Sequence, residues 1–139
     1  MEACKPSKTK IFLTCGYSIL ILLSSLIPMD QSAESFRFFL SLKPAVQNLL
    51  HIPAFAILSI LCLQVLGYSP MDRTRKLIRV LMFSVAFGIV NEWVQFAIPS
   101  RYPGSLEIML NSVGSALGML VYLAAESRQS GLIRRLVCG

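Results

Sequence analysis

The chain has 139 residues, of which 55% are hydrophobic and only 14% are charged, and its mean hydropathy is +0.65. Because a soluble domain carries about 25% charged residues, this composition argues against a soluble protein and predicts a small integral membrane protein. The net charge of +6 does not indicate nucleic-acid binding, since the basic residues form neither a face with interleaved aromatics nor a known nucleic-acid-binding module.

Four apolar runs, taken in chain order, predict four membrane-spanning helices. The first covers residues 11–27 and follows three lysines. A basic head before an apolar run is also typical of a signal peptide, but this run exceeds the usual h-region of about 7–15 residues and no A-x-A site follows it. We therefore expect it to remain as the first span. The other spans cover residues 49–66, 77–98 and 106–125.

The connections between the spans differ in character. Residues 30–48 mix aromatic side chains with cations, a pattern that fits either a short interfacial helix or a loop folded over the bundle, and Pro44 is expected to end this piece. The tail, residues 126–139, is expected to be a frayed basic segment or to lie on an anionic membrane surface. The predicted fold is all-α, with residues 1–139 forming a single polytopic four-helix membrane domain.

The distribution of cations predicts the orientation of this bundle. Ten of the 13 lysines and arginines fall on one side of the predicted spans, and three, Arg37, Lys43 and Arg101, fall on the other. Because cytoplasmic loops carry the excess of Lys and Arg, we expect both termini in the cytoplasm. The predicted location is the bacterial cytoplasmic (inner) membrane, with lipids as immediate partners.

Polar side chains among the apolar runs mark the candidate site. With a rise of about 1.5 Å per residue along a helix, six of them fall near the outer ends of spans two to four or in the outer hinge. The candidate binding residues are His51, Glu92, Gln95, Arg101, Glu107 and Asn111. Intramembrane charges are costly and usually functional, so the pattern predicts an outward-facing polar cleft.

Helical phase points to the same faces. Residues three or four positions apart share a face of a helix, which aligns Glu107 and Asn111 with two glycines on span four. These are Gly114 and Gly118, whose G-x-x-x-G spacing predicts close helix packing. Gly88 has the same expected role on span three.

Several chemistries are open to these residues. Glu92 and Glu107 are either a proton-exchanging pair or partners of Arg101 in a structural ion-pair network. Arg101 can bind a phosphate or carboxylate through its planar guanidinium. His51 is a candidate base, proton carrier or hydrogen-bond donor, or an interfacial histidine bonded to a backbone carbonyl, and Asn111 suits interhelical packing. With no H-E-x-x-H pattern and no C-x-x-C spacing, we expect no metal and no cofactor.

The same residues resemble a known family. The sequence reads Glu92-x-x-Gln95-x-x-x-Pro99-x-Arg101, then Ser105-x-Glu107-x-x-x-Asn111-x-x-Gly114-x-x-x-Gly118. This pattern resembles the signature of the VanZ-like family of small bacterial membrane proteins. The stretch from Asn48 to Leu58 resembles that family's histidine-bearing helix, so the likeness covers spans two to four.

The resemblance has two departures and one functional implication. Glu107 stands where the family usually has Asp, and Gln47 and Asn48 stand where it tends to have an Asp-Lys pair. The second departure weakens a role for a charge pair at span two. The family is linked to low-level resistance to the glycopeptide teicoplanin, a drug that acts on cell-wall precursors outside the membrane.

Two functions of different classes follow as hypotheses. In the first, a non-enzymatic envelope protein binds a lipid head group, a lipid-linked precursor or an amphiphilic drug, with Arg101 on the anionic group. In the second, a small membrane enzyme acts on such a head group, with His51, Glu92 or Glu107 as acid or base. A proton-coupled carrier is a third, which needs a homo-oligomer or larger complex because four spans alone form no transport pathway. The lack of a nucleophile or metal motif favours binding over catalysis.

Overall fold

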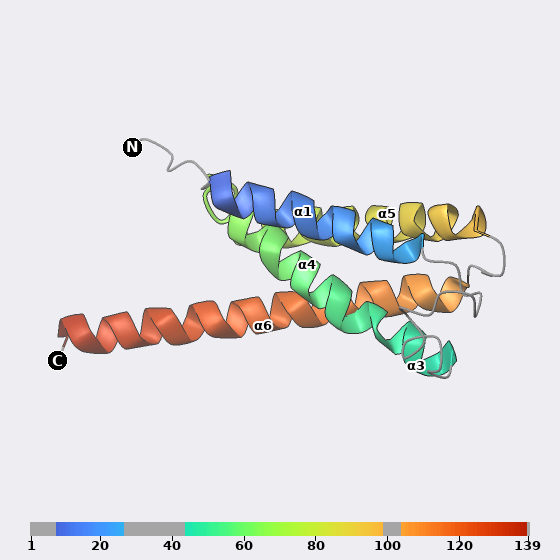
Figure 1. Ribbon diagram of the computed structural model, residues 1–139. Helices are drawn as coiled ribbons and strands as arrows, with labels where there is room; N and C mark the ends of the chain where they lie inside the picture. The colour runs from blue at the N-terminus through green and yellow to red at the C-terminus, as the bar shows by residue number, and fades with distance from the viewer. Residues whose placement is uncertain (1–7, 27–43, 99–103, 139) are drawn as a thin grey trace.

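The computed structural model describes residues 8–26, 44–98 and 104–138, and it describes their side chains except at 44, 45, 47 and 129–138. Every regular element in this part of the chain is an α-helix (Figure 1). The helices are α1 (Lys8–Ser25), α3 (Pro44–Leu49), α4 (His51–Leu66), α5 (Arg73–Phe96) and α6 (Ser105–Cys138). The prediction of an all-α fold is confirmed for the described residues.

Local sequence signals account for several helix ends. Asp72 precedes α5 in an extended conformation, and its Oδ1 accepts a 2.8 Å hydrogen bond from the backbone N–H of Arg75, as an N-cap residue does. Gly67 follows α4, and its N–H donates to the Leu63 carbonyl oxygen at 2.8 Å. α5 ends at Phe96, shortly before Pro99 in the sequence. The residue before a proline disfavours the helical conformation, so a helix usually stops there.

Two connections differ from the sequence-based expectation. Pro44, expected to end the piece before it, is the first residue of a helix, α3, because its fixed φ and missing N–H suit the first helical position. The tail is helical, since α6 continues to Cys138, which differs from the frayed segment that is one of the two expectations. The other expectation, that the tail lies on an anionic membrane surface, stays a prediction. This segment contains no proline, the strongest breaker of helices. The stretch 30–43, in which an interfacial helix or loop is expected, lies outside the described residues.

Two described helices are long and apolar enough to cross a membrane. They are Arg73–Phe96 and Ser105–Arg128, which correspond to the predicted third and fourth spans. α4, at the predicted second span, is apolar but shorter. α1 covers Lys8–Ser25, where the sequence predicts a first span over 11–27.

α4 is the central helix of the bundle. It packs most extensively against α6 and also contacts α1 and α5, and in Figure 1 it crosses diagonally between α1 and α6. A Cβ added at Gly114 would lie only 2.9 Å from the Cα of Ile52. One added at Gly118 would collide with the Ala56 carbonyl and lie 2.5 Å from Ser59 Oγ. The two glycines therefore permit backbone contact between α4 and α6.

The interior of this bundle is unusually polar, and its outside is apolar. Phe55 and Leu58 are fully buried and form a core cluster with Ile21. The buried polar residues are Ser25, Ser59, Ser84, Asn91, Glu92, Gln95, Asn111 and Ser115. Large apolar side chains face outward, among them Phe12 and Trp93, which are 77% and 76% exposed.

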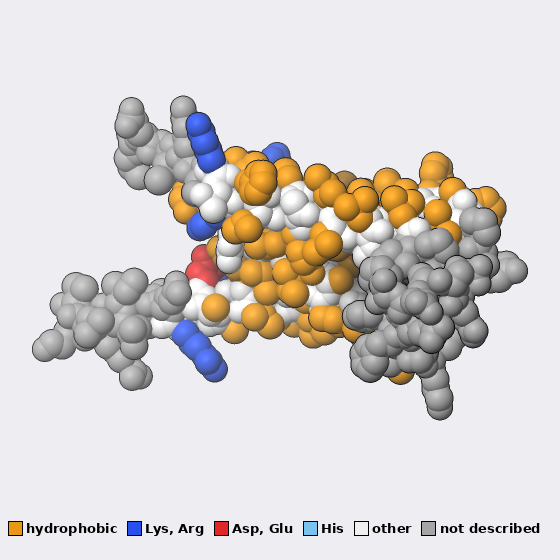
Figure 2. Space-filling model, viewed as in Figure 1, with side chains coloured by type: hydrophobic (Ala, Val, Ile, Leu, Met, Phe, Trp, Pro, Cys, Tyr) orange, Lys and Arg blue, Asp and Glu red, His pale blue; other side chains and the backbone are white. Residues whose placement is uncertain are grey.

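The end of the bundle far from His51 is charged. Lys10 Nζ donates to the Tyr68 hydroxyl at 3.0 Å and lies 4.9 Å from the centre of that ring. Arg73 at the start of α5 pairs with Glu126 of α6, with Nη2 and Oε2 3.4 Å apart. In Figure 2, charged side chains gather at this end, and hydrophobic side chains cover the middle of the visible face.

Candidate functional site

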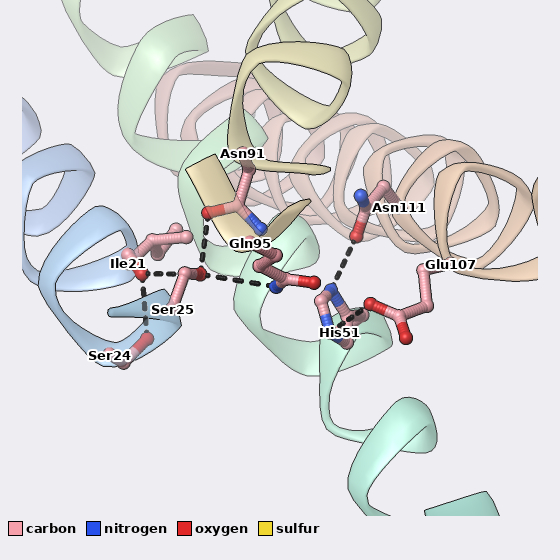
Figure 3. Close-up of polar contacts among 8 residues, drawn as sticks. All are labelled: Ile21, Ser24, Ser25, His51, Asn91, Gln95, Glu107 and Asn111. Carbon is pink, nitrogen blue, oxygen red and sulfur yellow. Dashed lines mark hydrogen bonds and ion pairs between the residues drawn. The ribbon is translucent and has the colours of Figure 1, made fainter. Parts of the chain in front are cut away.

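His51 is the first residue of α4, and both of its ring nitrogens face side chains of α6 (Figure 3). Nδ1 lies 2.9 Å from Asn111 Oδ1, and Nε2 lies 3.3 Å from Glu107 Oε2. Glu107 and Asn111 are four positions apart in the first turns of α6, so both project from one face of that helix. The side chains of His51 and Glu107 are 18% and 14% exposed, which leaves this pair partly accessible.

α5 adds a second carboxylate to this pair. Glu92 is only 3% exposed, and one donor atom each from His51, Glu92 and Glu107 lie within 4.8 Å of one another. One turn before Glu92, a Cβ added at Gly88 would lie 3.0 Å from Asn111 Nδ2. The missing side chain at Gly88 therefore lets Asn111 lie against α5. Three helices contribute side chains to one polar cluster, which consists of His51, Glu92, Glu107 and Asn111.

The orientation of the Asn111 amide constrains the histidine. Because Asn111 Oδ1 can only accept, His51 Nδ1 must carry the proton of that hydrogen bond. Nε2 then faces Glu107 either as the second N–H of an imidazolium or with a lone pair. Asn111 Nδ2 is buried and makes no hydrogen bond among the described residues, so the oxygen is the engaged end of this amide.

A second polar group joins α1 to α5. Ser25 Oγ donates to Asn91 Oδ1 at 2.6 Å, and Gln95 Nε2 donates to Ser25 Oγ at 3.4 Å (Figure 3). Asn91 and Gln95 are 0% and 3% exposed. A hydrogen bond between buried polar groups holds two helices in one relative position, because leaving either group unpaired in a medium of low dielectric is costly.

The predicted site residues are therefore distributed over two groups. His51, Glu92, Glu107 and Asn111 form the polar cluster, and Gln95 bonds to Ser25 of α1. Arg101 and the hinge around it lie outside the residues that the structure describes. The glycines expected to pack helices are placed where helices touch, with Gly88 against Asn111 and the G-x-x-x-G pair against α4.

Sequence reasoning missed Ser25 and Asn91. A signal for Asn91 was present, because it precedes Gln95 by four positions and shares its helix face. Ser25 offers no comparable signal, since a serine at the end of an apolar run also suits a lone hydrogen bond to its own helix backbone. Only the packing of α1 against α5 shows that its hydroxyl crosses to another helix.

Comparisons with known protein families, with curated proteins and with solved structures give no match to this chain.

Proposed function

We propose that this chain is a multi-pass protein of the bacterial cytoplasmic membrane, with α1, α4, α5 and α6 as its spans. Large apolar side chains are exposed along each helix, among them Phe12, Ile57, Met82 and Leu120. In water they would form apolar patches of a size that monomeric soluble proteins rarely show. α1 and α4, with 18 and 16 residues, extend about 27 and 24 Å, so flanking residues complete their passage through a core of about 30 Å.

The proposed orientation places the polar cluster on the outer side. Lys10, Arg73 and Lys76 lie at one end of the bundle. The sequence-based assignment puts ten of the 13 lysines and arginines on the side of these three residues, and cytoplasmic segments carry such an excess. His51 begins α4 at the opposite end, about 24 Å away along the 16 residues of that helix. The cluster then lies near the extracytoplasmic face.

Within this frame, we infer that the protein binds the head group of a lipid, a lipid-linked envelope precursor or an amphiphilic drug. The observation that carries the proposal is the convergence of His51, Glu92, Glu107 and Asn111 from three helices, with two of these side chains still partly exposed. Polar groups in an apolar bundle are costly and mark ligand or ion sites. The resemblance to the VanZ-like family also supports this proposal. The family's link to teicoplanin, a drug that acts outside the membrane, favours a site on the extracytoplasmic side and an envelope precursor or amphiphilic drug as the ligand.

A membrane enzyme acting on a lipid-linked precursor is the second candidate. It is favoured by the 3.3 Å contact between His51 Nε2 and Glu107 Oε2, because a carboxylate that orients an imidazole is a common arrangement for general acid–base catalysis. Binding remains the first choice because the cluster contains no serine, cysteine or threonine nucleophile.

The test uses the purified full chain in detergent micelles with a short-chain, diphosphate-containing analogue of a lipid-linked precursor. Native mass spectrometry should show the analogue retained on the wild-type protein and unchanged in mass. Glu107→Gln should retain at least about 10-fold less, which corresponds to about 1.4 kcal/mol, because the substitution removes the charge that fixes His51. Glu126→Gln is the matched control, since this carboxylate lies at the other end of the bundle.

The outcomes separate the candidates. Equal retention by wild type and Glu107→Gln in folded protein would reject the polar cluster as the binding site. Release of a cleaved or transferred product would establish the enzyme instead. Expression of the same variants in a teicoplanin-susceptible bacterium, with membrane abundance measured alongside, tests whether this chain shares the family's phenotype.

A further inference from the structure

The facing atoms of His51 and Glu107 need a cation between them. Nδ1 donates to Asn111 Oδ1, so Nε2 is the nitrogen that faces the Glu107 carboxylate oxygen at 3.3 Å. If Nε2 has a lone pair, two acceptors face each other, and either a proton or a metal ion must separate them. A charge-assisted N–H···O bond is normally about 2.7–2.9 Å long, which is shorter than this contact.

The same distance suits two ligands of one metal ion. Nitrogen and oxygen ligands lie about 2.0–2.2 Å from Zn²⁺ in tetrahedral sites, so neighbouring ligand atoms are about 3.3–3.5 Å apart. The His51–Glu107 pair already has this spacing. The spacings that involve Glu92 are at most 4.8 Å, and rotation of its long side chain can close the difference.

We propose that His51, Glu92 and Glu107 bind a divalent transition-metal ion such as Zn²⁺, through Nε2 and one oxygen of each carboxylate. A neutral imidazole with two carboxylates carries a formal charge of −2, which a divalent ion matches. Nitrogen and carboxylate ligands together suit first-row transition metals better than Ca²⁺ or Mg²⁺, which prefer oxygen ligands alone.

The position of Asn111 agrees with a ligand role for His51. A metal-ligating histidine almost always donates its other ring N–H to an oxygen acceptor, which fixes the ring and its tautomer. The 2.9 Å contact of Nδ1 with Asn111 Oδ1 has this form, and the Asn111 side chain lies against α5 at Gly88. Asn111 is thus a positioning residue and not a ligand.

The sequence alone does not predict this site. Its three ligands come from α4, α5 and α6 and are separated by long stretches of chain, so they form no short motif of the H-E-x-x-H kind. The inference deepens and rests on the proposed function, because three protein ligands leave an open position that the phosphate of a head group can occupy.

The experiment measures metal binding without any lipid ligand, which separates its failure from that of the proposed function. The full chain is purified in detergent, treated with a chelator and titrated with Co²⁺ as a spectroscopic substitute for Zn²⁺. We expect one equivalent of Co²⁺ per chain, with the visible absorption bands of a four- or five-coordinate ion. His51→Gln and Glu107→Gln should lose these bands, and Glu126→Gln should keep them.

Asn111 gives a graded test of the geometry. Asn111→Ala should weaken Co²⁺ affinity about 10- to 100-fold, the usual effect of removing a group that orients a ligand. Asn111→Asp should restore most of it, because a carboxylate also accepts the Nδ1 proton. Circular dichroism and gel filtration establish that each variant is folded.

X-ray absorption of the Zn²⁺-loaded wild type keeps the proposal testable even if every variant fails to fold. We expect a shell of nitrogen and oxygen that includes one imidazole. A sulfur shell would assign the ion to the cysteines and overturn the proposal. No saturable binding, or Co²⁺ bands that persist in His51→Gln and Glu107→Gln, would also overturn it. If the wild-type protein binds the diphosphate analogue but no metal ion, the metal site is rejected and the proposed function stands.

Discussion

Ser25 and Asn91 show how single polar residues act inside this bundle. Their 2.6 Å hydrogen bond joins α1 to α5 at a position where Asn91 is fully buried. Interhelical hydrogen bonds in membrane proteins contribute about 0.6 kcal/mol on average and up to about 1.7 kcal/mol, because the unfolded chain in the membrane also finds partners. The value of such a bond is therefore more in selecting one helix arrangement than in stability.

A double-mutant cycle of Ser25→Ala and Asn91→Ala tests this bond. We expect a coupling energy between about 0.6 and 1.7 kcal/mol from reversible unfolding of the purified protein in mixed micelles. Ser18→Ala is the control for α1, because its hydroxyl bonds to the Thr14 carbonyl of the same helix and should show no coupling to Asn91→Ala. Additive effects for Ser25 and Asn91 would contradict the assigned contact.

At the scale of helices, the α4–α6 contact determines where the polar cluster forms. The two glycines of α6 let that helix approach the backbone of α4 at Ile52 and Ala56. Ile52 is next to His51 on α4, and Asn111 is one turn before Gly114 on α6. The close approach of the two helices therefore also brings the His51 imidazole to Asn111. Packing and site geometry are therefore coupled through one helix pair.

Gly118→Val should destabilise the protein by about 1–3 kcal/mol or more, the usual cost of overpacking, because the added atoms would collide with the Ala56 carbonyl. The measurement is the midpoint of thermal unfolding in detergent. Gly16→Ala is the matched control, since nothing lies within 4 Å of the added Cβ and alanine favours a helix over glycine by about 1 kcal/mol. Equal midpoints for Gly118→Val and wild type would show that α4 and α6 are not in backbone contact.

The local sequence pattern predicts where the helices lie, but it predicts their first and last residues less well. A described helix lies within or across each of the four predicted apolar runs, because long apolar stretches favour helix. Pro53 does not prevent this, since it falls in the first turn of α4, where proline is tolerated. Pro44 and the tail show the limit of this reasoning. Proline is compatible with a helix start as well as with a helix end, and local polarity in the tail did not prevent α6 from continuing.

At the scale of the whole molecule, polar and charged side chains lie at the two ends of the bundle, and apolar side chains cover the helices between them. Lys10, Arg73 and Glu126 lie at one end, and the polar cluster lies at the other. If this axis is the membrane normal, the positive-inside rule determines which face the cluster meets. Topology is thus the property on which the proposed access to envelope ligands depends.

Labelling of single-cysteine proteins tests that topology. A protein that retains only Cys138 should resist a membrane-impermeant maleimide in intact cells and react after permeabilisation, because the C-terminal end is expected in the cytoplasm. Arg37→Cys in a background without other cysteines is the control for the outer side and should react in intact cells. Labelling of Cys138 from outside would reverse the orientation and place the cluster near the cytoplasm.

By itself, the sequence determined the helical class, the positions of the apolar runs and the common depth of His51, Glu92, Glu107 and Asn111. These properties depend on composition, on the rise per residue and on helical period, which are local quantities. Only the tertiary structure decided that Nδ1 of His51 meets Asn111 and Nε2 meets Glu107, that Glu92 joins them, and that Gln95 bonds to Ser25. Such pairings depend on the rotation and crossing of whole helices, which no local pattern encodes.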